Sequence, residues 1–242
     1  MTVLKDQIAL VTGATGGIGS AIAEALATQG AHLLITGRTE AKLEAEAERL
    51  RSRGYNTEWY LCDLTKDEAV RQLCDCVTKK FGRLDILVHS AGEIGHGRLA
   101  DEPVTALDVQ YQANVRGPLL LTQGLLPLLK RPKGQIVFIN SSTGLRARAN
   151  TGHFSATQHA FRAIADSLRD EVNAEGVRVL SVFPGRTATN RTSELHTTEG
   201  RPFEPELLLQ PRDIASVVLN ALSLPWSAEV TDVSIRPMQK SY

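Results

Sequence analysis

The sequence predicts an α/β fold: a single doubly wound domain in which a parallel seven-stranded sheet carries helices on both faces. Apolar strand patterns alternate with helical patterns at intervals of roughly 25–45 residues, as expected for successive βαβ units. No repeat, low-complexity segment or linker-like change in composition divides the 242 residues. We therefore expect one domain over residues 1–242, long enough to bury a sizeable core.

The first half of the chain contains three expected strand–helix pairs and a fourth strand. Short, mostly apolar runs predict strands at residues 8–12, 31–36, 57–61 and 85–89. The helices that follow the first three strands are alanine-rich or charged, at residues 18–27, 40–53 and 65–80. Gly54 is expected to close the second of these helices, and Thr65 or a neighbour to cap the third.

The second half begins with a long apolar helix, expected from Pro103 to Leu129. Pro118 and Pro127 predict a bend or break in it, because proline has no amide hydrogen to donate. Further strands are expected at residues 135–140, 177–183 and 230–235, and further helices at residues 152–174 and 211–222. The polar stretch 186–210 is long for a connection, so we expect it to lie over the ligand cleft as a lid.

A glycine-rich turn, Gly13-x-x-x-Gly17-x-Gly19, joins the first strand to the first helix. Glycines let the backbone turn tightly and approach a ligand, and a helix start offers unpaired N–H groups to a pyrophosphate. An ordinary βα turn is the alternative interpretation. Ligands of doubly wound sheets bind beyond the carboxyl ends of the strands, so the turn and the strand ends together predict a dinucleotide site. The residues expected to contact the cofactor are Gly13, Thr15, Gly17, Ile18, Gly19, Arg38, Asp63, Leu64, Ser90, Ala91, Gly92, Pro184, Gly185, Thr187 and Thr189.

The residues that end the second strand favour NADP(H) over NAD(H). NAD sites usually place an acidic residue there for the ribose 2′-hydroxyl, whereas this chain has Gly37-Arg38. A guanidinium can form a charge-assisted fork with a 2′-phosphate, and the Thr15 hydroxyl can join it. The alternative for Arg38 is a solvated surface charge. Asp63, at the end of the third strand, is expected to accept from the adenine amino group, to cap the next helix, or both.

Composition and charge argue against several other classes of function. Lysine plus arginine and aspartate plus glutamate number 27 each, so no overall charge favours nucleic acid or an acidic membrane as a partner. The three cysteines cannot all pair and no histidine cluster accompanies them, which favours a reduced, intracellular chain without a metal site. The first residues have no apolar signal core, and no run reaches transmembrane length. We expect a cytoplasmic protein.

Together these pieces resemble the classical short-chain dehydrogenase/reductase family over essentially the full length of the chain. The matching motifs are Thr12-Gly13-x-x-x-Gly17-x-Gly19, Asp63, Ala91-Gly92, Asn114, Ser142 and Pro184-Gly185, in order and spacing. The resemblance implies a Rossmann-type fold, NADP(H) as cofactor, and hydride transfer to or from a small carbonyl, alcohol or related substrate. It also implies a homodimer or homotetramer.

The resemblance places the expected catalytic set at Ser142, Asn114, Phe154 and Gln158. In the family a tyrosine protonates the developing alkoxide, a lysine four residues later lowers the phenol pKa, a serine orients the carbonyl and an asparagine supports a water. Ser142 and Asn114 match, but Phe154 and Gln158 stand at the tyrosine and lysine positions. Phenylalanine has no proton to give and glutamine stays neutral. Since a positioned general acid is worth roughly 10²–10⁴-fold in rate, we expect ordinary carbonyl reduction to be severely impaired.

Three interpretations of this incomplete set remain open. The first is an NADP(H)-dependent oxidoreductase with a substitute acid or an already cationic substrate, such as an iminium. His153 is the nearest candidate acid, although its helix position turns it about 100° from Phe154. The second is a non-catalytic NADP(H)-binding protein, a sensor or partner subunit. The third, a structural protein that has lost the cofactor too, is the least favoured because the phosphate-binding turn and Arg38 are intact.

The expected lid carries four basic side chains whose role the sequence leaves open. They either attract an anionic substrate or are simply solvated. These residues are Arg186, Arg191, His196 and Arg201.

Overall fold

The computed structural model describes residues 3–239. In this part of the chain, seven strands form one parallel sheet in the order β3-β2-β1-β4-β5-β6-β7. The strands are β1 (Ile8–Thr12), β2 (His32–Gly37), β3 (Thr57–Leu61), β4 (Ile86–His89), β5 (Gln135–Ile139), β6 (Arg178–Pro184) and β7 (Asp232–Ile235). The predicted fold class is confirmed. The ends of the expected domain, residues 1–2 and 240–242, lie outside the described residues.

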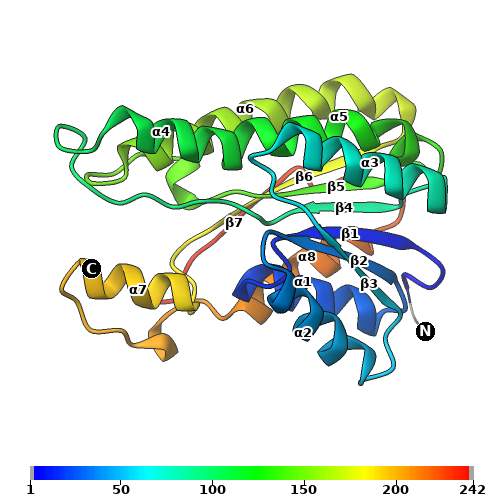
Figure 1. Cartoon of the computed structure of the whole chain (residues 1–242), viewed down its shortest axis with the longest axis horizontal. Helices are drawn as coiled ribbons and strands as arrows, with labels where there is room; N and C mark the ends of the chain where they lie inside the picture. Colours follow the sequence, from blue (N-terminus) through cyan, green and yellow to red (C-terminus); the bar gives the residue numbers. More distant parts are fainter. Residues whose placement is uncertain (1–2, 240–242) are drawn as a thin grey trace.

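Helices cover both faces of the sheet (Figure 1). One face carries α3 (Asp67–Phe81), α4 (Val104–Tyr111), α5 (Gly117–Lys130) and α6 (Gly152–Val172). The other face carries α1 (Gly17–Thr28), α2 (Glu40–Arg51) and α8 (Pro211–Leu222). In β1, Leu10 packs into the core on the first face while Ala9 and Val11 pack into the core on the second. Because both faces are buried, the strands appear in the sequence as continuous apolar runs. Among residues 3–239, no helix is both long and apolar enough to cross a bilayer.

The long helix expected over residues 103–129 is interrupted by a wide turn. A π-helical turn, Gln112–Arg116, separates α4 from α5. Pro118 lies in the first turn of α5, and its missing N–H removes the α-helical donor for the carbonyl four residues earlier, that of Asn114. Pro127 stays inside α5. The break therefore falls at Asn114, one of the expected catalytic residues, and π-turns are frequent at functional sites.

The start of α3 differs from the expectation. Its N-cap residue is Lys66, and no side chain caps it. The amide and the hydroxyl of Thr65 both donate to Asp63 Oδ1, each at 2.9 Å. The side chains of Asp63 and Thr65 therefore close a turn ahead of the helix, and the expectation that either one caps it is wrong.

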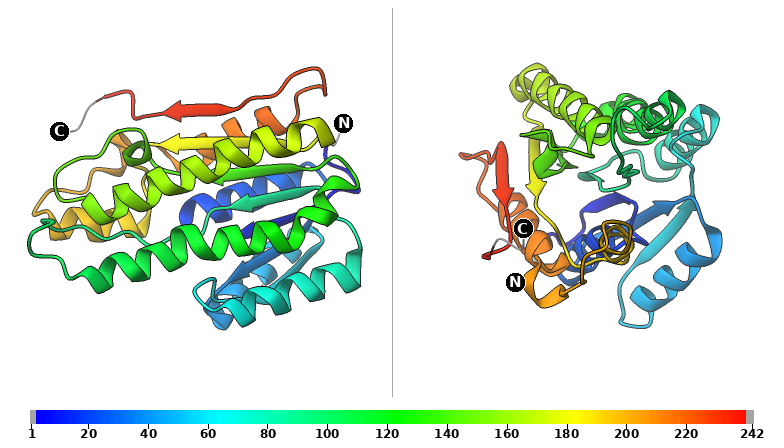
Figure 2. Two further views of the ribbon diagram at one scale, coloured as in Figure 1. Left: turned by 90° about the horizontal axis from the view of Figure 1, so that it is seen from above. Right: turned by 90° about the vertical axis from the view of Figure 1, so that its left-hand side faces the viewer.

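The stretch 186–210 contains regular structure that the sequence analysis did not predict. It holds α7 (Asn190–Thr198) and a 3₁₀ turn, Pro205–Leu207. The Thr189 hydroxyl caps α7 by accepting from the Thr192 amide at 3.2 Å. In the left panel of Figure 2, α7 lies at the end of the molecule toward which the strand arrows point. The segment thus lies where the carboxyl ends of the strands gather.

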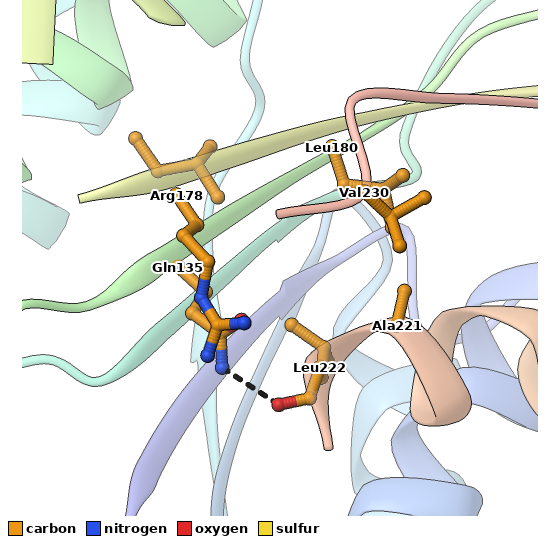
Figure 3. A pocket seen from close by; sticks show the side chains of 7 residues that line it. Gln135, Arg178, Leu180, Ala221, Leu222 and Val230 are labelled. Carbon is orange, nitrogen blue, oxygen red and sulfur yellow. Dashed lines mark hydrogen bonds between the residues drawn. The ribbon is translucent and has the colours of Figure 1, made fainter. Parts of the chain in front are cut away.

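The opposite end of the sheet is closed by polar side chains around a small pocket (Figure 3). Gln135 Nε2 donates to the carbonyl of Leu222 at 3.1 Å, and Arg178 Nη1 to that of Ala228 at 2.9 Å. The Arg178 guanidinium also lies over the Trp226 ring, 3.9 Å from its centroid. Gln135 and Arg178 begin β5 and β6, so these contacts tie the strand starts to the end of α8 and to the segment that follows it.

Candidate active site

The glycine turn is shaped by two close backbone approaches. Gly13 has φ of +66°, and a Cβ at this position would lie 2.8 Å from the Cα of Ala91. A Cβ on Gly17 would lie 2.7 Å from Thr189 Cγ2, at the entry to α7. The structure favours glycine at both positions because the end of β1 approaches the segment after β4, and the start of α1 approaches Thr189.

The ends of β1 and β4 are joined by one hydroxyl. Thr12 Oγ1 accepts from the amides of Ser90 and Ala91 at 3.0 and 3.1 Å. Gly92 follows directly, and a Cβ there would lie 3.0 Å from Asn114 Oδ1. The structure thereby brings the glycine turn, the small residues after β4 and Asn114 into one region.

Arg38 follows β2 beside the glycine turn. The Thr15 hydroxyl lies 3.7 Å from where a Cβ on Gly37 would stand, so it belongs to the same corner. The Arg38 side chain is 61% exposed, and its Nη1 also forms an ion pair with Glu93. Arg191 of α7 contacts the same carboxylate, with Nη2 at 3.5 Å from Oε2. Glu93 is a residue that the sequence analysis missed, although its position directly after Ala91-Gly92 was a signal.

The residues expected at the adenine end lie together after β3. Asp63 Oδ1 accepts hydrogen bonds from the amide and the hydroxyl of Thr65. Leu64 is buried against the start of α5, where a Cβ on Gly117 would lie 2.2 Å from the Leu64 carbonyl oxygen. This close contact fixes the backbone that carries Asp63.

The expected catalytic set comes from three elements. Ser142 begins a 3₁₀ turn after β5, and the neighbouring Ser141 hydroxyl caps that turn by accepting from the Thr143 amide at 3.2 Å. Phe154 and Gln158 lie one turn apart on α6, which packs on this 3₁₀ turn. Gln158 is buried, and its main-chain carbonyl accepts from Asn140 Nδ2 at 3.0 Å.

Asn114 is fully engaged by its neighbours. Its Oδ1 accepts from the Glu93 amide at 2.6 Å, and its Nδ2 donates to the Glu93 carbonyl at 2.8 Å. Nδ2 also donates to Thr157 Oγ1 at 3.0 Å. The Thr157 hydroxyl in turn donates to the carbonyl of Phe154 at 2.8 Å. Asn114 therefore ties the loop after β4 to α6, a role in which Thr157 is the partner that the sequence analysis missed.

His89 lies beneath this region at the end of β4. The Thr122 hydroxyl donates to the Pro118 carbonyl at 2.9 Å, so it accepts from His89 Nε2, 2.8 Å away. His89 thus carries its proton on Nε2, and Nδ1 is left without a partner. Burial lowers the pKa of His89 to about 3, so the ring is neutral near pH 7.

His153 lies beside a carboxylate of the loop before α4. Its Nδ1 lies 3.3 Å from Glu102 Oε2, in the loop before α4. The ring is 10% exposed. The helix turn between residues 153 and 154 therefore directs this imidazole to a carboxylate of its own, as the 3.6-residue period suggests.

The basic residues of the lid are matched within the protein. Glu199, 8% exposed, accepts from Arg186 Nη2 at 2.6 Å, and its carboxylate lies 3.1 Å from His96 and 3.7 Å from Arg201. Burial opposes ionisation of Glu199, but the hydrogen bond and charge of Arg186 outweigh it, so the pKa of Glu199 is lowered. His196 is buried, with Nδ1 at 2.8 Å from the Pro202 carbonyl. Arg186 and the buried His196 are therefore matched within the protein, whereas the side chains of Arg191 and Arg201 remain 45% and 49% exposed beside their carboxylates, so a role for them with an anionic substrate stays a prediction.

The turn after β6 reaches the lid through its backbone. The Thr187 hydroxyl donates to the Gly185 carbonyl at 3.1 Å, and the Gly185 amide donates to Ile235 of β7 at 2.8 Å. The Ala188 amide donates to the Leu209 carbonyl at 2.7 Å. Pro184 and Gly185 thus lie at the carboxyl edge of the sheet, together with the other strand ends that the sequence analysis singled out.

Comparison with known proteins identifies the family of this chain. Residues 7–200 match the family described as short chain dehydrogenase. An uncharacterized oxidoreductase of Staphylococcus aureus (strain MRSA252) is 34% identical over 239 residues, which is 98% of this chain and 100% of that protein.

Solved structures with similar folds cover nearly the whole chain. A short chain dehydrogenase of Shigella flexneri 2a, complexed with NADP, has a TM-score of 0.88 and 32% identity over 96% of this chain and 98% of its own. An alcohol dehydrogenase of the archaeon Thermococcus sibiricus, complexed with 5-hydroxy-NADP, has a TM-score of 0.86 and 28% identity over 98% of this chain and 99% of its own. The chain therefore belongs to the short-chain dehydrogenase family.

Proposed function

We propose that this chain is an NADP(H)-dependent short-chain oxidoreductase whose ordinary carbonyl reduction is severely impaired. The observation that carries the proposal is the contrast on α6, where Phe154 and Gln158 replace the proton-delivery pair beside an intact Ser142. NADP(H), when bound, supplies or accepts the hydride. The described residues offer a place for it, because Gly13 and Gly17 keep the backbone at the strand ends free of side chains.

The cofactor is proposed to lie across the carboxyl edge of the sheet. The turn from Gly13 to Gly19 would hold the pyrophosphate at the start of α1. Arg38 and Thr15 would take the 2′-phosphate, and Asp63 and Leu64 the adenine. The nicotinamide end would lie near Ser90 to Gly92 and the turn holding Pro184, Gly185, Thr187 and Thr189. Similar structures that contain NADP or 5-hydroxy-NADP, including those of Shigella flexneri and Thermococcus sibiricus, support this choice of cofactor.

Proton delivery is the missing part of the proposed reaction. Phe154 has no hydroxyl, Gln158 has no charge to lower a neighbouring pKa, and His153 is paired with Glu102. Ser142 can still orient a carbonyl by donating a hydrogen bond. The substrates that we expect to react are small molecules that need no acid, of which an iminium is the simplest.

A second candidate function is a non-catalytic NADP(H)-binding protein, a sensor or partner subunit. The observation that favours it is Asn114, whose side chain is spent on Glu93 and Thr157. An amide used in this way acts as a structural tie between the loop after β4 and α6. The cofactor cradle would remain useful without any turnover.

We also propose a lid, an oligomeric state and a cellular location for the protein. Residues 186–210 would act as the lid, since Arg191 Nη1 donates to the Gly92 carbonyl at 2.5 Å. A homodimer or homotetramer is supported by exposed apolar side chains on α4, namely Val104, Val109 and Tyr111. Three free cysteines, Cys62, Cys74 and Cys76, are consistent with a cytoplasmic location.

Restoring the missing pair tests the proposal. The double variant Phe154→Tyr with Gln158→Lys is assayed for NADPH oxidation with simple aldehydes and ketones, beside the wild type and a set of cyclic imines. We expect carbonyl reduction to rise by roughly 10²–10⁴-fold, since one positioned acid contributes that much. Wild-type turnover of imines favours the impaired enzyme, and NADPH binding without turnover of any substrate favours the second candidate. No NADPH binding by either protein contradicts both.

A further inference from the structure

A three-residue bridge crosses the cofactor side of the sheet. Glu93, just after β4, pairs through one carboxylate oxygen with Arg38 at the end of β2. Its other oxygen lies 3.5 Å from Arg191 Nη2 on α7. Arg191 also donates to the Gly92 carbonyl at 2.5 Å. One carboxylate thus links the corner proposed for the 2′-phosphate to the lid.

The backbone of Glu93 is fixed independently of its side chain. Its amide and its carbonyl are both held by the Asn114 side chain, at 2.6 and 2.8 Å. Asn114 is 2% exposed and is itself anchored to α6 through Thr157. The carboxylate is therefore presented toward Arg38 from a rigid base, and replacing it leaves the backbone contacts in place.

The bridge puts a carboxylate where the proposed function needs a phosphate. Both groups are anions, and both seek the same guanidinium fork. A 2′-phosphate that reaches Arg38 must displace Glu93 or share Arg38 with it, and a nearby like charge weakens its binding. A 2′-hydroxyl carries no charge and does not meet this penalty.

We infer that Glu93 is a specificity-determining residue for the cofactor: its carboxylate competes with the 2′-phosphate for Arg38 and so reduces the preference for NADP(H) over NAD(H). This inference rests on the proposed function, because it concerns the same cofactor site. It goes beyond that function by assigning a selectivity role to a residue outside the glycine turn and the catalytic set. The same carboxylate also contacts Arg191 of α7, with 3.5 Å between Glu93 Oε2 and Arg191 Nη2.

The test is a calorimetric titration of NADPH and NADH into four proteins: wild type, Glu93→Gln, Arg38→Gln and the double variant. We expect Glu93→Gln to tighten NADPH binding by about threefold to tenfold, the range expected for an exposed ion pair plus a removed like charge, and to change NADH binding by less than about twofold. In the Arg38→Gln background the same change should tighten NADPH binding by less, because only the relief of like charge remains. Glu175→Gln is the matched control, because Glu175 pairs with Lys130 at 2.6 Å near the amino ends of the strands.

The outcomes separate the inference from the function on which it rests. Unchanged NADPH affinity in Glu93→Gln, or equal tightening of NADPH and NADH, overturns the inference while the wild type still binds NADPH. Retention of the full effect without Arg38 overturns it as well. If none of the four proteins binds NADPH, the proposed function fails first. Thermal melting of each variant establishes that a changed affinity does not come from a changed fold.

Discussion

The turn after β1 and the first turns of α6 face the same end of the sheet but tolerate change very differently. At Gly13 a single added Cβ would meet Ala91 at 2.8 Å, so the backbone itself demands glycine. On α6, Phe154 and Gln158 stand at the positions where we propose that a tyrosine and a lysine have been replaced, and the helix is regular and packs on the 3₁₀ turn that begins at Ser142. Chemistry that resides in the end of a side chain can be lost without cost to the fold. Chemistry that resides in the shape of the backbone cannot.

We expect the largest effect on activity from substitutions at Phe154 and Gln158, made singly and together. Phe154→Tyr alone restores a hydroxyl, but without the Lys ammonium its pKa stays near 10, so it should regain only part of the rate. Gln158→Lys alone should regain almost nothing. We expect the two changes together to exceed the product of the single gains, because residues that act as a unit are not additive. Steady-state NADPH oxidation with one aldehyde measures all three variants, and independent gains would contradict the account.

The next effect concerns the backbone side of the comparison. Gly13→Ala combines a positive φ with a backbone contact and should cost about 2–4 kcal/mol of unfolding free energy. For a chain of this size that lowers Tm by roughly 5–15 °C, and NADPH binding should be lost. Gly54→Ala is the matched control, with φ of +85° but no atom within 4 Å of the added Cβ. Equal melting shifts for the two variants would show that the close approach to Ala91 is unimportant.

A third effect concerns the pH dependence of stability that arises from the buried His89. The unfolded chain protonates His89 near pH 6.5, whereas burial holds the pKa of the folded protein at about 3. Its contribution to stability is complete above pH 6.5 and falls by about 1.4 kcal/mol per pH unit as the pH drops toward 3. Between pH 7 and pH 5, His89→Asn should therefore lose about 2 kcal/mol less than the wild type in urea unfolding. The exposed His159→Asn serves as the control, and parallel curves for all three proteins would contradict the assignment.

The smallest effect tests whether α7 opens independently of β1 and α1. Thr189→Ala removes the hydroxyl that caps α7 and should cost about 1 kcal/mol. Because α7 is a short surface helix, we expect the loss to appear as faster amide hydrogen exchange in residues 190–198, with little change in Tm. Thr198→Ala, at the other end of α7, is the matched variant. An equal increase in exchange throughout β1 and α1 would mean that the lid is not a separate unit.

The sequence predicted the parts of this fold that depend on local pattern. β1 and β3 have the expected bounds, and the other strands agree within two residues, because buried parallel strands are continuous apolar runs. The glycine turn was visible because its spacing is a local property of the backbone. Ser142, Phe154 and Gln158 were located by resemblance, and the structure places them on neighbouring elements.

The parts that escaped prediction depend on contacts between distant residues. The π-turn at Asn114 arises from Pro118 together with the ties to Glu93 and Thr157, which no helical pattern contains. α7 was missed because its sequence is polar, and its cap at Thr189 is a weak signal. The ion pair of Glu93 with Arg38 joins residues 55 positions apart. Which side chains meet across the ends of a sheet depends on the order of the strands. The sequence pattern alone did not give that order.

Cofactor binding without ordinary carbonyl reduction is tested most directly by the fluorescence of NADPH, which is followed as NADPH binds the wild-type protein and as a simple ketone is then added. We expect a saturable change in fluorescence that reports binding, followed by a signal that does not decay on a timescale of minutes after the ketone is added. Absence of binding at millimolar NADPH would contradict the intact cradle. Consumption of NADPH at about 10 s⁻¹, a typical rate for enzymes, would contradict the loss of proton delivery at Phe154 and Gln158.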